Sequence, residues 1–211
     1  MKLFLSSGDI PSSLRENFLA LVGKKVADIK FALIENAADP YPDDTKGWMF
    51  DTRKSFESLG MQVTFVDLRM HKEDPESLYL MLKEFDVVWI GGGNTYYMRW
   101  LMKVSGFDTI IKKLLDEGIV YGGGSAGAIL PCPVLEKFDV VDDPNAAPEV
   151  IKQGLGLIDF VIVPHWGDPE YQSRLDEIKN YYDALKRCPV VTITDNQAVV
   201  VDGDSCEIHP I

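Results

Sequence analysis

Short apolar runs alternate with amphipathic stretches along most of the chain. The apolar runs lie at residues 2–6, 31–34, 63–68, 87–90, 119–121 and 160–163. Apolar residues at helical spacing lie at residues 13–22, 43–59, 75–84, 95–104, 108–117 and 171–185. Buried strands that alternate with helices are typical of a mostly parallel sheet covered on both faces. The pattern therefore predicts an α/β fold, a three-layer sandwich with a mostly parallel central sheet, as a single domain over residues 1–211.

Two further features of the pattern concern the edges of this sheet. Residues 190–194 and 198–202 are rich in apolar residues and are separated by Asp195, Asn196 and Gln197, which predicts a terminal hairpin near one edge. Conspicuous loops follow three predicted strands, at residues 35–39, 91–94 and 122–125. Ligands of open α/β sheets bind at the carboxyl ends of the strands. We therefore expect the functional site there, with the two glycine loops side by side.

The composition excludes several classes of protein. No apolar segment approaches the roughly twenty residues that a membrane span needs, and the apolar start at residues 1–5 is better explained by a first strand than by a signal peptide. The net charge of -12 disfavours nucleic acid as a partner, because the phosphates would be repelled. Cys132, Cys188 and Cys206 form no CxxC pair, so neither a disulfide framework nor a metal site is predicted. We expect a cytoplasmic protein without a membrane segment.

The loop at residues 122–125 carries a candidate nucleophile. Gly123, Ser125 and Gly127 follow the apolar run 119–121 and match the G-x-S-x-G pattern, in which a serine lies on a sharp turn between a strand and a helix. Glycines flank such a serine because side chains would collide with the neighbouring backbone. The alternative is a glycine-rich turn whose serine caps the following helix. The pattern alone leaves both interpretations open.

A catalytic serine needs a base, and the chain has three histidines. His165 follows the predicted strand 160–163 and therefore lies at the same sheet edge as Ser125. His71 lies in a polar segment and is expected to be exposed. His209 remains an alternative, because the order serine, acid, histidine of the α/β-hydrolases would be met by Ser125, then Asp195 or Asp202, then His209.

Backbone donors for an oxyanion hole are available next to this serine. The loop 91–93 supplies one candidate N–H group, and Ala126, at the start of the following helix, supplies the other. A tight turn or a phosphate-binding loop is the other interpretation of residues 91–93. The chain has no third glycine at the dinucleotide-binding position and no Walker lysine after the loop, so nucleotide binding is not expected.

Three segments together resemble a known family. Residues 89–95 (WIGGGNT), 122–128 (GGGSAGA) and 164–166 (PHW), in this order and spacing, are similar to the peptidase E or alpha-aspartyl dipeptidase family, and the likeness covers most of the chain. The resemblance implies a fold like the class I glutamine amidotransferase domain. It also implies a serine-type exopeptidase that hydrolyses short peptides, in particular dipeptides with an N-terminal aspartate, without metal or cofactor. By this resemblance Ser125 is the nucleophile and His165 the base, with Gly92 and Ala126 as oxyanion-hole donors.

The resemblance also places an acid after the nucleophile helix, within residues 135–143. Asp139 is nearest in spacing, and Glu136 and Asp142 are the alternatives. The remaining residues with an expected role in binding substrate are Gly91, Asn94, Thr95, Trp166 and Asp168. Asp168 is a candidate for holding the free amino group of the substrate, although Trp166 also fits core packing and Asp168 a turn.

The segment after His165 departs from the family pattern. It has no evident arginine to pair with a substrate aspartate; the nearest basic residue, Arg174, falls within a predicted helix. Two other functions therefore stay open besides the peptidase. One is an esterase or amidase that uses Ser125 with His209, and the other is a non-catalytic small-molecule-binding protein of the same fold. In the peptidase interpretation the partner is a short peptide, and the protein is a monomer or a small homo-oligomer.

Overall fold

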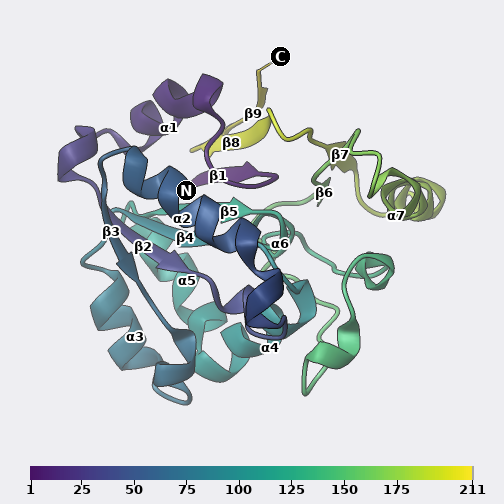
Figure 1. Ribbon diagram of the computed structural model, residues 1–211, viewed down its shortest axis with the longest axis horizontal. Coiled ribbons are helices and arrows are strands. Elements are labelled where there is room, and N and C mark those ends of the chain that lie inside the picture. Colours follow the sequence, from purple (N-terminus) through teal and green to yellow (C-terminus); the bar gives the residue numbers. More distant parts are fainter. Residues whose placement is uncertain (211) are drawn as a thin grey trace.

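A computed structural model describes residues 1–210 of the chain, so residue 211 of the predicted domain lies outside it (Figure 1). Its centre is a seven-stranded sheet with the strand order β3-β2-β4-β5-β1-β8-β9. The strands of this sheet are β1 (Lys2–Ser6), β2 (Lys30–Ile34), β3 (Gln62–Phe65), β4 (Val87–Ile90), β5 (Val120–Gly124), β8 (Ala198–Asp202) and β9 (Ser205–His209). The first five strands in the spatial order are parallel, whereas β8 and β9 are antiparallel to their neighbours. The predicted, mostly parallel α/β sheet is confirmed.

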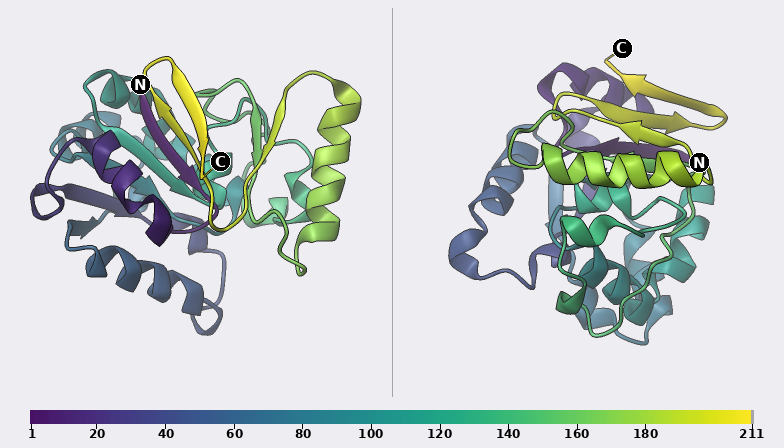
Figure 2. Two further views of the ribbon diagram at one scale, coloured as in Figure 1. Left: turned by 90° about the horizontal axis from the view of Figure 1, so that it is seen from above. Right: turned by 90° about the vertical axis from the view of Figure 1, so that its right-hand side faces the viewer.

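Helices cover both faces of this sheet (Figures 1 and 2). They are α1 (Arg15–Val22), α2 (Gly47–Ser58), α3 (Pro75–Leu82), α4 (Thr95–Ser105), α5 (Phe107–Asp116) and α6 (Ala126–Ile129), whereas α7 (Gln172–Leu185) lies to one side of the sheet. Alternate residues of each strand point to opposite faces. On β1, Phe4 packs in the core beneath α1 and α2, whereas Leu3 and Leu5 pack in the core that includes α3, α4 and α5. Among residues 1–210, no helix is both long and apolar enough to cross a bilayer.

A second, two-stranded sheet lies beside the main one and carries part of the site. It pairs β6 (Val161–Val163) with β7 (Val190–Thr192) in parallel, and α7 connects the two strands. The predicted hairpin of residues 190–194 with 198–202 is therefore wrong. Instead β8 enters the main sheet beside β1 and forms the terminal hairpin with β9. The apolar, β-branched runs at 190–194 and 198–202 are alike in sequence, so the pattern does not show which partner each strand takes.

Candidate active site

Ser125 lies on a sharp turn between β5 and α6. Its backbone dihedrals are φ 52° and ψ -112°, and its N–H donates to the Ser6 carbonyl of the neighbouring strand β1 at 3.1 Å. A non-glycine residue with positive φ costs about 1–3 kcal/mol, and such strain concentrates at functional sites. The Ser125 side chain makes no capping hydrogen bond to α6. The alternative interpretation, in which the Ser125 side chain caps the following helix, is therefore wrong.

The flanking glycines permit this turn because backbone crosses backbone at each of them. A Cβ atom at Gly123 would overlap the Gly127 carbonyl, and one at Gly127 would overlap the Ile90 carbonyl of β4. An alanine at position 123 would push α6 away from β5, and an alanine at position 127 would push α6 away from β4. The G-x-S-x-G pattern is explained here by packing that holds the serine turn against β4.

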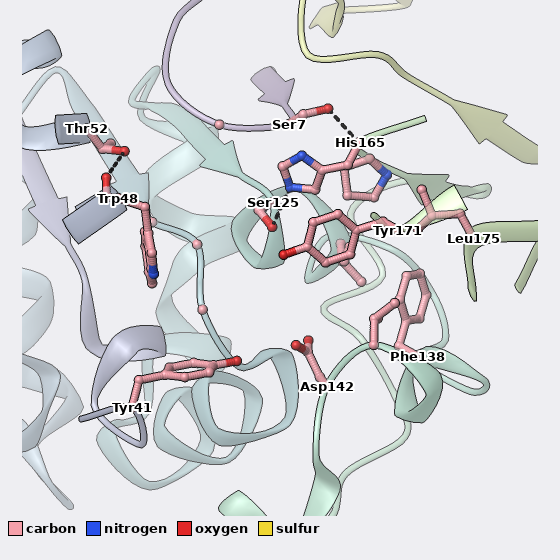
Figure 3. Close-up of a pocket in the computed structure, with 17 residues that line it drawn as sticks. Ser7, Tyr41, Trp48, Thr52, Ser125, Phe138, Asp142, His165, Tyr171 and Leu175 are labelled. Atoms are coloured by element: carbon pink, nitrogen blue, oxygen red, sulfur yellow. Dashed lines mark hydrogen bonds between the residues drawn. The ribbon is translucent and has the colours of Figure 1, made fainter. Parts of the chain in front are cut away.

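His165 joins the serine to an acid. Its Nε2 lies 3.1 Å from Ser125 Oγ (Figure 3). Its Nδ1 lies 2.8 Å from Asp195 Oδ1. A carboxylate only accepts, so Nδ1 carries the proton in the neutral ring and Nε2 is left to accept from the serine hydroxyl. The predicted pairing of Ser125 with His165 is present in the structure.

Two parallel strands bring the histidine and the acid together. His165 comes two residues after β6 and Asp195 three residues after β7, and Val163 pairs with Thr192 at the ends of these strands. Ser7 adds a brace from the main sheet: its Oγ accepts from the His165 N–H at 2.9 Å and lies 3.2 Å from the Thr194 carbonyl. The backbone on both sides of the His165–Asp195 pair is thereby tied to the end of β1.

The acid that the sequence favoured is not beside His165. Asp139 is exposed, because the turn that holds it buries the neighbouring Phe138 in the core. Glu136 accepts from the Tyr181 hydroxyl at 3.2 Å, and Asp142 from the Thr95 N–H at 3.0 Å. Asp195 replaces Asp139 as the partner of His165.

His209 does not reach this serine. It lies on β9, at the opposite edge of the main sheet from β3, and its Nε2 is 3.2 Å from Glu207 Oε2. In the part of the chain that the structure describes, neither His209 nor His71 makes a hydrogen bond to Ser125. The arrangement of Ser125, an acid and His209 expected for an α/β-hydrolase is therefore absent from the described residues. One of the two acids considered for it, Asp195, contacts His165 instead.

Two backbone N–H groups border the serine. A Cβ atom at Gly92 would lie 3.2 Å from Ser125 Cβ, so the glycine loop passes directly beside the candidate nucleophile. The N–H groups of Gly92 and Ala126 have no hydrogen-bond acceptor within residues 1–210. Both donors predicted for the oxyanion hole are thus available next to Ser125.

A cavity of about 390 Å³ opens in front of Ser125 and His165. Of the residues predicted to bind substrate, Gly91 lines it and Asn94, Thr95, Trp166 and Asp168 do not. Asn94 caps α4 by accepting from the Tyr97 N–H at 2.9 Å, and Asp168 accepts from the Glu170 N–H at 2.8 Å within a turn. Trp166 packs against the core. Of these four, Thr95 contacts a lining residue, because its N–H donates to Asp142 at 3.0 Å.

Aromatic side chains that the sequence analysis left unassigned form much of the wall. Tyr41 and Trp48 lie on one side of the cavity, and Phe138 and Tyr171 on the other (Figure 3). The Tyr171 ring stacks on the His165 ring, with 5.6 Å between centroids. These aromatic residues come from three separate segments of the chain, which is why no local motif pointed to them.

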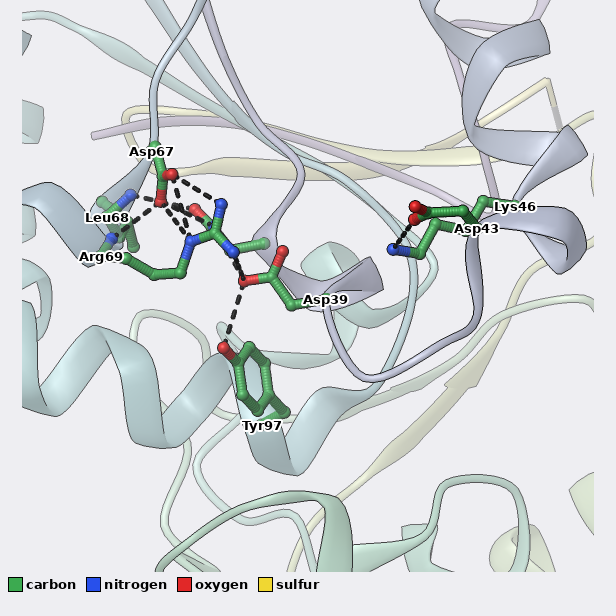
Figure 4. Close-up of polar contacts among 8 residues, drawn as sticks. Asp39, Asp43, Lys46, Asp67, Leu68, Arg69 and Tyr97 are labelled. Carbon is green, nitrogen blue, oxygen red and sulfur yellow. Dashed lines mark hydrogen bonds and ion pairs between the residues drawn. The ribbon is translucent and has the colours of Figure 1, made fainter.

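An ion-pair network holds the loop that carries Tyr41. Asp39 accepts from the Asn36 amide at 3.0 Å and from the Tyr97 hydroxyl at 3.1 Å, and it lies 3.5 Å from the Arg69 guanidinium (Figure 4). Arg69 also pairs with Asp67, and its hydrogen bonds lower the pKa of Asp67 to about 2. The network ties the start of this loop to α4 and to the segment after β3.

Asp142 is the acidic residue that lines the cavity (Figure 3). Burial raises the pKa of its carboxyl above the ordinary value, and the hydrogen bond from Thr95 opposes that rise. A raised pKa means that the folded chain binds this proton more tightly than the unfolded chain does. The free energy of unfolding therefore falls as pH rises from the unfolded pKa to the folded one, and the penalty persists at neutral pH.

We expect Asp142→Asn to unfold at a higher temperature than the wild type at pH 7, because the variant removes a poorly solvated charge and keeps an oxygen for the Thr95 N–H. Each kcal/mol gained shifts the melting temperature by about 2–4 °C in a chain of this length. The gain should vanish near about pH 3, where the carboxyl is protonated in both states. Asp143→Asn, at the exposed neighbouring position, is the matched control. An unchanged or lower melting temperature for Asp142→Asn at pH 7 would contradict this account.

Comparison with known proteins gives the family. The family model for peptidase family S51 matches residues 3–209. The protein named uncharacterized peptidase Lin0382 from Listeria innocua is 28% identical over 151 residues, 71% of this chain and 70% of its own length. A Drosophila melanogaster protein named probable alpha-aspartyl dipeptidase is 32% identical over 129 residues, 58% of this chain and 52% of its own. A crystal structure of a candidate peptidase E from Listeria monocytogenes matches the fold with a TM-score of 0.83 at 21% identity, over 100% of this chain and 98% of that one. The chain therefore belongs to peptidase family S51 and is a peptidase, a hydrolase of peptide bonds.

Proposed function

We propose that this protein is a serine-type exopeptidase of short peptides, in which Ser125 is the nucleophile, His165 the base and Asp195 the acid that orients the base. The observation that carries the proposal is the continuous chain of contacts from Ser125 Oγ through the His165 ring to Asp195. The strained backbone of Ser125 and of His165, with φ of 52° and 59°, adds support, because a non-catalytic serine turn would not need it.

The reaction follows from this geometry as two acyl transfers. His165 Nε2 takes the proton of Ser125 Oγ as the oxygen attacks the scissile carbonyl carbon. The carbon–nitrogen bond then breaks, and His165 gives the proton to the departing amine. Water, deprotonated by the same ring, attacks the acyl-serine and releases the free acid. Asp195 holds the Nδ1 proton throughout and stabilises the positive charge on the ring.

Negative charge develops on the carbonyl oxygen in both tetrahedral intermediates. The N–H groups of Gly92 and Ala126 border Ser125 and are the proposed donors to that oxygen. A side chain at position 92 would crowd Ser125 Cβ, at 3.2 Å, so the loop needs glycine to bring its N–H this close. No metal or cofactor is needed for any of these steps.

The cavity favours a small substrate. Its volume of about 390 Å³ is near the lower end of the range of about 300–1,000 Å³ that small-molecule pockets span, which suits a peptide of two or three residues. An N-terminal aspartate is the finer specificity implied by the family resemblance, and the printed name of the Drosophila relative is consistent with it. For this chain it rests on that likeness alone.

Asp195→Asn is expected to lower kcat/KM by roughly 10²–10³-fold, because the amide can hold the wrong tautomer of His165. A larger loss is not expected, since the Asp195 side chain is 60% exposed and water can partly replace it. Asp139→Asn makes the same chemical change at the exposed residue first favoured by the sequence and should retain wild-type kcat/KM. Loss of activity in Asp139→Asn with little change in Asp195→Asn would overturn the proposed assignment.

A further inference from the structure

The cavity carries negative charge and offers no cation for a substrate carboxylate. Within residues 1–210, its lining includes Asp142 but neither a lysine nor an arginine. Three basic residues are adjacent in sequence to lining residues, and none of them lines the cavity. Arg53 pairs with Glu35, Lys137 pairs with Glu177 at 3.1 Å, and Arg174 lies over the Tyr171 ring at 4.9 Å. A bound aspartate side chain would find hydroxyl groups but no lysine or arginine among these lining residues.

The Asp142 carboxylate is placed to accept from a ligand. It points into the cavity, toward the space between Tyr41 and Tyr171 (Figure 3). One oxygen accepts from the Thr95 N–H at 3.0 Å, while Oδ1 has no hydrogen-bond donor in the described part of the chain. A carboxylate with poor solvation and an unused oxygen favours a cationic partner. Every peptide with a free amino terminus supplies one.

The side chains around this carboxylate favour an apolar group. Tyr41, Trp48, Phe138, Tyr171 and Leu175 present rings and methyl groups to the cavity. Apolar substrate surface gains from leaving water against such walls. A second carboxylate beside Asp142 would instead lose its hydration and be repelled by a like charge. The walls therefore discriminate against aspartate as well as favouring apolar residues.

We propose that this cavity selects short peptides that have a free N-terminal ammonium, which pairs with Asp142, and an apolar or aromatic first side chain, which packs on the aromatic walls. The inference deepens the proposed function and rests on it, because hydrolysis would occur at the same Ser125. It departs from the aspartate preference that the family resemblance implies.

Steady-state kinetics on four peptides provides the test: Phe-Ala, Leu-Ala, Asp-Ala and N-acetyl-Phe-Ala. We expect kcat/KM for Phe-Ala and Leu-Ala to exceed that for Asp-Ala at least tenfold. N-acetylation removes the cation and should lower kcat/KM for Phe-Ala roughly hundredfold, which is the scale of losing one partner of a desolvated charge pair. A preference for Asp-Ala over Phe-Ala would overturn the inference.

Asp142→Asn separates the charge pairing from a structural role. It should lower kcat/KM for Phe-Ala roughly hundredfold, mainly through KM, and leave N-acetyl-Phe-Ala within about threefold of wild type. Asp143→Asn carries the same change at the exposed neighbouring residue and should leave both substrates unchanged. An equal fall for the free and the acetylated peptide in Asp142→Asn would contradict pairing with the ammonium.

Binding to Ser125→Ala, measured by isothermal titration calorimetry, distinguishes failure of this inference from failure of the proposed function. Tighter binding of Phe-Ala than of Asp-Ala or N-acetyl-Phe-Ala supports the inference even if the wild-type protein hydrolyses none of them. Ser125-dependent hydrolysis with a preference for Asp-Ala leaves the proposed function standing and overturns the inference. Failure of Ser125→Ala to bind any of these peptides at millimolar concentration also overturns it.

Discussion

Ser125→Ala is expected to lower kcat/KM for hydrolysis of short peptides by roughly 10⁴–10⁶-fold, the scale found when a serine peptidase loses its nucleophile. Ser125 Oγ is the atom that attacks the carbonyl, and the described residues place no second hydroxyl in contact with His165 Nε2. The main-chain turn is held by Gly123, Gly127 and the hydrogen bond to Ser6, so the variant should fold. Residual hydrolysis above the uncatalysed rate would come from the oxyanion donors and from binding.

The measurement compares progress curves for the wild type, Ser125→Ala and the control Ser205→Ala, whose serine is exposed on β9. Thermal unfolding of all three proteins shows whether the fold is kept. Retention of more than about one hundredth of wild-type activity by a folded, contaminant-free Ser125→Ala would contradict a covalent role for this serine.

The second large effect is expected at His165. His165→Ala should lower kcat/KM by roughly 10⁴-fold or more, because the serine then has no base and the departing amine has no acid. The variant also removes the ring on which Tyr171 stacks, so some loss of stability is expected as well. Hydrolysis of a common dipeptide substrate by purified His165→Ala and His209→Ala gives the comparison.

His209→Ala is the matched control for that experiment. It removes a histidine that contacts Glu207 at the far edge of the sheet, and it should keep kcat/KM within about twofold of wild type. Loss of hydrolysis in His209→Ala with hydrolysis retained in His165→Ala would support the serine, acid, histidine order of an α/β-hydrolase and would contradict the proposed mechanism.

The sequence predicted the layers of the fold because most strands of the main sheet are short apolar runs bounded by loops, whereas β9, which is exposed along most of its length, was not predicted. It failed at residues 190–202, where two similar apolar runs follow each other. Two apolar runs separated by three to five residues are typical of a hairpin. In the structure, however, β7 pairs in parallel with β6, and β8 pairs with β1. Strand pairing across long sequence separations is decided by tertiary packing, which local pattern does not contain.

The same error separated the acid from His165. Asp195 was expected at the tip of a hairpin, where an aspartate is an ordinary turn residue, and was considered as a catalytic acid only together with His209. Once β6 and β7 are known to be parallel neighbours, their carboxyl ends meet, and the residues that follow them, His165 and Asp195, fall together. Ser125 and His165 could be predicted because each directly follows a recognisable strand.

The residues that line the cavity could not be predicted from the sequence for a different reason. Tyr41 and Phe138 come from segments whose sequences suggest only irregular structure, and Tyr171 comes from the start of a predicted helix. Their positions around the cavity depend on contacts that the chain makes after folding, such as the Asp39 network. Asp142 was considered only as a triad member. Its side chain lines the cavity and accepts from Thr95, a contact that needs the fold to be known.

Intact-mass spectrometry after treatment with a fluorophosphonate, followed by peptide mapping, tests the central claim most directly. Such reagents modify a serine whose oxygen is activated by a neighbouring base. We expect one adduct per chain, on Ser125, that is absent in Ser125→Ala, forms more slowly in Asp195→Asn and forms at the wild-type rate in Asp139→Asn. An unmodified wild-type protein, or an adduct on a different residue, would contradict the claim that His165 and Asp195 activate Ser125 as the nucleophile.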